Sequence, residues 1–249
     1  MSAFTKCAFV AAGLYASVAA LHAAPVNGTG NVTPDVIFGT GGNANGSFTG
    51  QTVGNIEVGL RAKQRYPSPA NVFNYDGVDT YSFSNGGNPA NRSVFNFEWS
   101  VNVDKGGTSG KNLSDYDYSL GFDTDPTSGV SLTFIDPFAT FGYFDHSLGN
   151  NSTGSNAGVE SASNAALLTN MGLYSIAQQS SNLGFGFSAD PDLAGIYSFS
   201  FQVKEKVTGT VLSSSDITVN VPEPASLSLV LGALGLLGFS ARRRAKRQG

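Results

Sequence analysis

The chain has 249 residues, of which only 13% are charged, and it is rich in glycine (31 residues), phenylalanine (18) and tyrosine (9). Abundant aromatic residues favour half-buried strands and abundant glycine favours turns, so the composition argues against a mainly helical protein. The net charge is −4, but residues 25–222 hold 17 acidic against 8 basic residues. An acidic body without a basic patch argues against nucleic acid as a partner, because phosphate neutralisation requires clustered Lys and Arg.

Residues 1–23 have the three-part layout of a secretory signal peptide. Lys6 provides the positive charge, residues 7–21 are largely apolar, and small residues follow. Cleavage is predicted after Ala23, with Ala20 as an alternative site. The single cysteine, Cys7, lies inside this leader. The exported part is therefore expected to lack disulfides, thiolate metal sites and a Cys nucleophile.

The body, predicted over residues 24–221, begins with a loop-rich segment. Residues 28–54 are dominated by Gly and Asn around one apolar island at 36–38, and they are expected to contain a single early strand. Alternation of apolar and polar residues then predicts strands within 55–66, 93–103, 115–122, 197–203 and 217–221. Such one-sided alternation is typical of antiparallel sheets with one packed and one wet face.

The predicted fold class is therefore mostly β. About eight to ten strands would suffice for two stacked sheets, an antiparallel β-sandwich of jelly-roll or Ig-like type. One segment in the second half breaks the alternation. Residues 164–170 are rich in Ala, Leu and Asn, and they predict a short helix with Ser161 or Ser163 as its N-cap.

The body offers few candidates for catalysis. His146 is the only histidine beyond the leader, and the sequence contains no G-x-S-x-G elbow, so no catalytic residue is predicted. One His without Cys also cannot supply a usual zinc site. A glycosidase needs two carboxyl groups at a set separation. Glu57 and Glu98 fall on the polar faces of predicted strands, where we expect solvated side chains.

An acidic cluster in residues 115–129 is the best candidate for a metal site. Asp115 and Asp117 are two residues apart, so a strand would project both to one face. Asp123 and Asp125 follow in the next turn, and four oxygen donors of this kind would suit Ca²⁺. The alternative is that these aspartates form turns and keep an exposed face soluble. No other cofactor is predicted.

The end of the sequence has three parts in a fixed order. The residues Val221, Pro222, Glu223 and Pro224 come first, and an apolar run over residues 225–239 follows. As a helix this run would cover about 22 Å, less than a hydrocarbon core of about 30 Å. A cluster of cations completes the tail: Arg242, Arg243, Arg244, Lys246 and Arg247. Because cations stay on the cytoplasmic side, we predict a membrane stop with the body outside.

In these three parts the tail resembles the PEP-CTERM sorting signal of exported bacterial proteins. The resemblance implies that residues 222–249 are a sorting signal with a transmembrane helix. It also implies recognition by an exosortase, a membrane protease-transpeptidase, after export by the Sec machinery. Pro222, Glu223 and Pro224 would be the sorting and processing residues. Two prolines keep the backbone extended and remove amide donors, which makes the segment accessible to a protease.

The leading functional hypothesis is a non-catalytic exported protein of a Gram-negative bacterium. It would be anchored transiently in the inner membrane and delivered to the cell surface or the exopolysaccharide matrix, with exopolysaccharide or the cell envelope as its partner. The resemblance supplies this destination. The alternatives are a carbohydrate-binding module, with or without Ca²⁺, and a secreted glycan hydrolase that uses Asp or Glu pairs.

Overall fold

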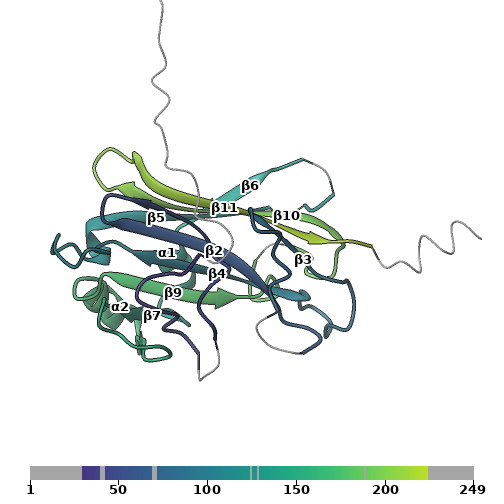
Figure 1. Ribbon diagram of the computed structural model, residues 1–249, viewed down its shortest axis with the longest axis horizontal. Helices are drawn as coiled ribbons and strands as arrows, with labels where there is room; N and C mark the ends of the chain where they lie inside the picture. Colours follow the sequence, from purple (N-terminus) through teal and green to yellow (C-terminus); the bar gives the residue numbers. More distant parts are fainter. Residues whose placement is uncertain are drawn as a thin grey trace, which may run out of the picture.

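The computed structural model describes residues 30–39, 43–68, 72–123, 125–127, 129–187 and 189–223. This part of the chain is mostly β, with two sheets packed on each other and only short helices (Figure 1). The predicted signal peptide over 1–23 and the predicted C-terminal helix lie outside the described residues. Within the described ranges, no helix combines the length and the apolar character needed to cross a membrane.

The first sheet has six strands, which lie in the spatial order β1-β2-β4-β9-β7-β8. Its strands are β1 (Thr49–Val53), β2 (Ile56–Gln64), β4 (Phe95–Asn102), β9 (Ile176–Ser181), β7 (Ser147–Gly149) and β8 (Val159–Glu160). All neighbouring pairs in this sheet are antiparallel. Residue-by-residue register places Leu60 of β2 opposite Trp99 of β4, so both side chains point to the same face.

The second sheet has five strands in the order β3-β11-β10-β5-β6. Its strands are β3 (Thr80–Ser82), β11 (Val211–Val221), β10 (Gly195–Glu205), β5 (Tyr116–Asp123) and β6 (Leu132–Ile135). Here the expectation of purely antiparallel sheets is wrong, because β3 pairs with β11 in parallel. The described residues contain eleven strands, slightly more than the pattern predicted, because strands as short as β7 and β8 have no visible alternation.

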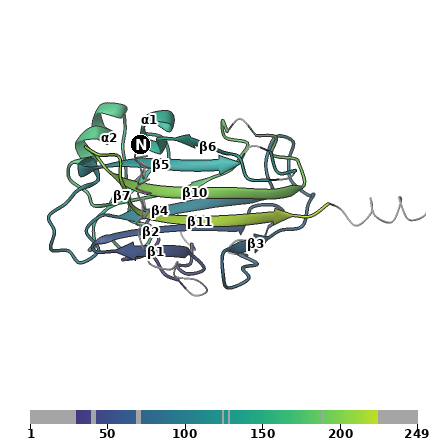
Figure 2. The same ribbon diagram turned by 90° about the horizontal axis from the view of Figure 1, so that it is seen from above.

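The helices are short and sit at one end of the sheets (Figure 2). They are η1, a 3-10 helix (Leu113–Asp115), α1 (Pro137–Phe141) and α2 (Asn164–Met171). The predicted helix at 164–170 is confirmed as α2, and Ser163 is its N-cap, accepting a hydrogen bond from the amide of Ala166. The sequence did not predict α1, which the Asp136 side chain caps by accepting from the amides of Phe138 and Ala139.

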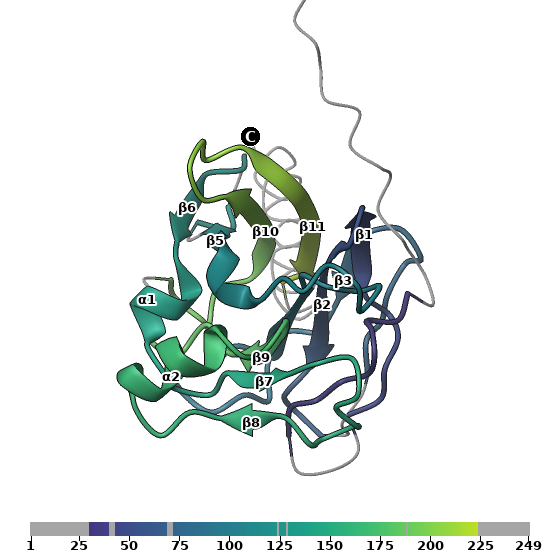
Figure 3. The same cartoon turned by 90° about the vertical axis from the view of Figure 1, so that its left-hand side faces the viewer.

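The two sheets face each other (Figure 3), and the core between them is strongly aromatic. The ring of Trp99 on β4 lies 5.0 Å from that of Phe201 on β10, and Phe97 lies 4.6 Å from Phe199. Offset and tilted ring pairs of this kind stabilise a core beyond the area that they bury. At one edge the sheets are also hydrogen bonded, since the Ser215 hydroxyl donates to the carbonyl of Thr49. The two sheets therefore form one continuous packing unit.

Residues 30–39 and 43–48, hereafter the covering segment, lie over the outer face of the first sheet. They contain no helix or strand, so the apolar island at 36–38 is a loop and the single early strand is β1. Val32, Val36, Phe38 and Phe48 form a separate small buried cluster. A side chain added at Gly59 of β2 would come within 3.1 Å of Val32 and 3.2 Å of Phe48. The covering segment therefore rests directly on β2.

The longer predicted strands are confirmed. The segments 55–66, 93–103, 115–122, 197–203 and 217–221 correspond to β2, β4, β5, β10 and the end of β11. Their apolar members face the core as the alternation predicts. The expectation that the opposite face is wet fails for β2 and β4, because the covering segment buries it.

Candidate functional sites

The predicted sorting residues begin where the second sheet ends. Val221 is the last residue of β11, is buried, and pairs with Gly195 of β10. Pro222 and Glu223 follow immediately and are exposed, while Pro224 and the cations from Arg242 to Arg247 lie outside the described residues. The folded body thus extends to the residue before the Pro-Glu-Pro, and an enzyme could reach Pro222 and Glu223 without unfolding a strand.

The four candidate calcium-binding aspartates are distributed over both ends of β5. Asp115 belongs to η1 instead of a strand, so it does not share a strand face with Asp117 as predicted. Its carboxylate accepts from the amide of Asn112 at 2.8 Å. Asp117 is exposed and lies opposite Lys204 of β10. Asp123 is six residues further along the strand, a separation of about 20 Å.

Asp123 and Asp125 instead organise the turn after β5. Asp123 is fully buried and accepts from the amides of Asp125 at 3.1 Å and Ser131 at 3.3 Å. Asp125 is exposed and accepts from the amide and hydroxyl of Thr127, which lowers its pKa. Across the described ranges, no three His, Cys, Asp or Glu side chains gather closely enough to hold a metal ion. The structure therefore does not support a shared calcium site on these residues.

Both strand glutamates are buried, so the expectation that they are solvated is wrong. Glu57 is 5% exposed and accepts from the amide of Thr33 at 2.7 Å, and it also pairs with Lys105. Glu98 is completely buried, with Arg61 Nε 2.6 Å from its Oε2 and Lys63 Nζ 2.6 Å from its Oε1. Burial alone would raise the pKa of Glu98, but the charges of Arg61 and Lys63 outweigh this effect and lower it. Glu98 is therefore an ionised carboxylate in a closed ion-pair cluster.

The structure places His146 in the core rather than in an accessible loop. Its ring is fully buried, 5.7 Å from that of Trp99 and 5.0 Å from that of Phe138. Burial lowers the pKa of His146 to about 4, although the backbone groups of Gly142 and Pro137 oppose the shift. The imidazole is thus neutral near pH 7 and has no access to a substrate.

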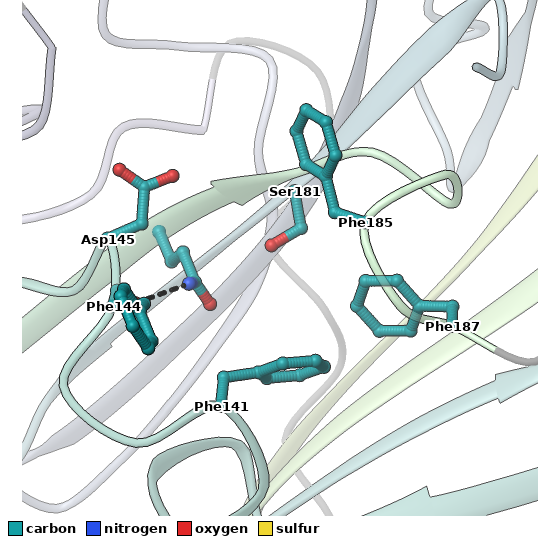
Figure 4. Close-up of a pocket in the computed structure, with 7 residues that line it drawn as sticks. Phe141, Phe144, Asp145, Ser181, Phe185 and Phe187 are labelled. Carbon is teal, nitrogen blue, oxygen red and sulfur yellow. Dashed lines mark hydrogen bonds between the residues drawn. The ribbon is translucent and has the colours of Figure 1, made fainter. Parts of the chain in front are cut away.

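One concave site of the described residues is an aromatic groove beside β9 (Figure 4). Its volume is about 300 Å³, and it is lined by Phe141, Phe144, Asp145, Gln179, Ser181, Phe185 and Phe187. Phe187 anchors it to the core through Phe97 and Phe122, with ring centroids 5.2 and 4.9 Å away. Phe144 and Phe185 remain 64% and 48% exposed, which is unusual for such large apolar side chains.

Polar groups fix the loops that carry these rings. Gln179 donates from its amide nitrogen to the carbonyl of Phe144 at 3.2 Å, and Asp145 has a φ of 62° in the tight turn that follows. The Arg92 guanidinium lies 4.8 Å from the centre of the Phe185 ring. A second, more polar pocket of about 450 Å³ adjoins the groove and shares Asp145 and Phe185 with it. The groove combines apolar platforms with a few placed polar groups, as ligand sites do.

Sequence reasoning did not identify the aromatic groove. Its aromatic residues come from two stretches, 141–146 and 183–187, which lie about forty residues apart and meet only because β7 pairs with β9. The local signal was a concentration of Phe among turn-forming Gly residues. The charged cluster of Arg61, Lys63 and Glu98 was also missed, although the place of Glu98 on a polar strand face was predicted.

Comparison with known proteins gives one match. A family model described as the PEP-CTERM protein-sorting motif matches residues 220–244. No curated protein and no solved structure matches the chain. The match begins in the last two residues of β11, confirms the resemblance found in the tail, and supports export and targeting to the cell surface. The chain therefore carries a PEP-CTERM sorting motif at residues 220–244, which supports its identification as an exosortase substrate.

Proposed function

We propose that this protein is a non-catalytic component of the cell surface or exopolysaccharide matrix, released from a transient inner-membrane anchor by exosortase processing. The observation that carries the proposal is the junction at Val221, where the last described strand ends within the first residues of the sorting motif. Cleavage just beyond this junction would leave every described strand intact. The body would then reach its destination as a finished β-sandwich, for which the jelly-roll and Ig-like arrangements remain the predicted types.

The environment of the titratable groups supports a non-catalytic role. His146 is buried among aromatic rings, and Glu98 is closed off by Arg61 and Lys63. General acid–base catalysis requires a group within hydrogen-bond reach of a bound substrate. Neither residue has such access, so a glycan hydrolase that uses Glu98 is the weakest of the three hypotheses.

The sorting proposal is tested by replacing the motif and following the protein in its native host. In the variant Pro222→Ala/Glu223→Ala/Pro224→Ala, we expect the tail to be retained and the protein to accumulate in the inner-membrane fraction. A matched variant, Thr208→Ala/Thr210→Ala in the β10–β11 turn, leaves the motif unchanged and should reach the surface. Surface delivery of the motif variant at wild-type levels would contradict the proposal.

A second candidate function is carbohydrate binding in the aromatic groove. The exposed rings of Phe144 and Phe185 are suited to stack against the apolar faces of sugar rings, while Asp145 and Ser181 offer hydrogen-bonding groups beside them. This function would also explain how the released protein stays within a polysaccharide matrix. It agrees with the non-catalytic proposal and specifies one partner.

A glycan array of the full-length protein, with and without EDTA, tests this second function. We expect binding to at least one matrix-type polysaccharide that EDTA does not alter, because the four candidate aspartates are dispersed. Loss of binding in EDTA would instead favour the calcium-dependent alternative. Absence of binding under both conditions would contradict the carbohydrate hypothesis and leave the sorting proposal standing.

A further inference from the structure

Lys63, Glu98 and Asn43 are in contact between the outer face of the first sheet and the covering segment. Lys63 Nζ on β2 donates to Oδ1 of Asn43 at 2.8 Å, and the same nitrogen lies 2.6 Å from Oε1 of Glu98 on β4. Asn43 belongs to the covering segment and precedes Lys63 by twenty residues in the chain. An amine, a carboxamide and a carboxylate are thus in direct contact, and none of these residues belongs to the sorting motif.

The surroundings hold this arrangement in place. Glu98 is fully buried, and the Lys63 side chain is only 12% exposed. The amide nitrogen of Asn43 donates to the carbonyl of Phe38 at 3.1 Å, so the carboxamide is held at both ends. The Phe38 ring also lies 5.7 Å from Lys63 Nζ. Groups fixed in contact in this way react with effective concentrations far above those of free solutes.

We propose that Lys63 and Asn43 join through an intramolecular isopeptide bond, and that Glu98 carries the proton in this reaction. The covering segment would then be linked covalently to β2. The reaction requires no cofactor and no oxidant.

The chemistry balances within the three side chains. The Glu98 carboxylate takes a proton from the Lys63 ammonium, and the neutral amine attacks Cγ of Asn43. A C–N bond forms between Nζ and Cγ, and the tetrahedral intermediate collapses as its bond to Nδ2 breaks. The proton held by Glu98 passes to Nδ2, which departs as ammonia. Glu98 then takes the second proton from the linking nitrogen and passes it to this ammonia, which leaves the site as ammonium. The product is a secondary amide, and Glu98 returns to its carboxylate form.

The charges of the cluster favour this product. Arg61 and Lys63 both pair with the single carboxylate of Glu98, so the buried group carries one surplus positive charge. Conversion of the Lys63 ammonium into an amide removes that charge and leaves Arg61 and Glu98 as a neutral pair. Arg61 keeps its other partners, because its guanidinium also donates to the carbonyls of Ala44 and Gly46. Burial of uncompensated charge is costly, so its removal stabilises the fold.

The isopeptide bond would also give the body a covalent cross-link that it cannot obtain from cysteine. The only cysteine is Cys7, so the body has no means of forming a disulfide. Proteins outside the cell often use covalent cross-links to constrain the unfolded chain. A link between Asn43 and Lys63 would close a loop of about twenty residues and prevent the covering segment from lifting away from Glu98.

Peptide mapping of the folded, full-length protein by mass spectrometry tests the proposal directly. Trypsin does not cleave after an acylated lysine, and Arg61 and Arg65 flank the site. We expect the peptide that ends at Arg61 to be joined to residues 62–65, with a mass lower than the sum of the two by one ammonia. Separate peptides, cleaved after Lys63 with Asn43 unmodified, would overturn the proposal.

Three variants test the roles proposed for Lys63, Glu98 and Asn43. Lys63→Arg keeps the positive charge but removes the nucleophile, so the joined peptide should be lost and the melting temperature should fall by several degrees. Glu98→Gln should also lose the joined peptide, and its persistence would overturn the role given to Glu98. Asn45→Ala is the matched control, since Asn45 contacts Val32 instead of Lys63 and precedes Gly46, where cyclisation also releases ammonia. Loss of the joined peptide in a folded Asn45→Ala protein would contradict the assignment to Asn43.

Discussion

Arg61 and Glu98 face each other across β2 and β4, with 2.6 Å between Nε and Oε2 and with both side chains fully buried. Phe48 and Phe73 lie against the guanidinium, whose centre is 4.1 and 4.7 Å from their rings. A charged pair on the outer face of a sheet is ordinarily solvated. Here the covering segment makes that face a second interior, which adds to the core between the sheets.

Removal of one partner of this pair should be strongly destabilising. Arg61→Met leaves the Glu98 carboxylate buried with fewer partners, and we expect the free energy of unfolding to fall by about 3 to 5 kcal/mol. Urea denaturation followed by circular dichroism measures the loss. The control is Lys111→Met, which removes an exposed pair with Asp115 and should cost about 1 kcal/mol or less. Equal effects of the two substitutions would contradict the buried cluster.

The stability of the protein should fall in mild acid because of His146. Its pKa is lowered from 6.5 to about 4 in the folded state, so between these values the unfolded chain binds a proton that the folded protein does not. Stability is therefore lost progressively as the pH falls from about 6.5 to 4, by up to about 3 kcal/mol. Urea titrations across this range should show the slope in the wild type, and His146→Phe should reduce it. An unchanged slope in that variant would contradict this assignment.

The exposed rings of the aromatic groove should matter for binding more than for folding. Phe185→Ala is expected to weaken binding to a polysaccharide identified on the array by at least tenfold, while the melting temperature changes little. Isothermal titration calorimetry provides the affinity. Phe134→Ala is the matched control, because Phe134 is 47% exposed on β6 of the other sheet. A similar loss of affinity in both variants would contradict a specific role of the groove.

The Asp136 cap should stabilise the helix that supports one side of the groove. Its side chain accepts from two amides in the first turn of α1, which carries Phe138 and Phe141. Asp136→Ala should lower the free energy of unfolding by about 1 kcal/mol. Asp136→Asn retains an acceptor and should recover most of this loss in the same denaturation experiment. A loss in Asp136→Asn as large as in Asp136→Ala would contradict the capping role.

The sequence predicted the long strands because their alternation is strict. In β4, for example, Phe97, Trp99 and Val101 point into the core between the sheets. The same alternation was misleading for Glu98, since a polar residue on the opposite face is solvated only if nothing covers it. The covering segment has no periodic pattern of its own, and its contact with Glu57 and Arg61 arises only in the folded chain.

The candidate sites, like the strands, could be predicted only where their residues form a local sequence pattern. The sorting residues Pro222 and Glu223 were found from local sequence, because the motif is a contiguous pattern. The aspartates looked like a cluster for the same local reason, but β5 separates Asp117 from Asp123 and turns Asp123 inward. The aromatic groove and the contact of Asn43 with Lys63 depend on chain segments that meet only in the tertiary structure.

If the PEP-CTERM motif sorts and releases the body, as proposed, the surface form lacks the end of the tail. The most direct test is the intact mass of the surface-exposed form, isolated from the native host with and without a functional exosortase. We predict a wild-type mass that includes the body through Val221 but lacks Arg242, Arg243 and Arg244, and an uncleaved tail in the exosortase-deficient strain. A surface form that retains the arginine cluster in both strains would contradict the account.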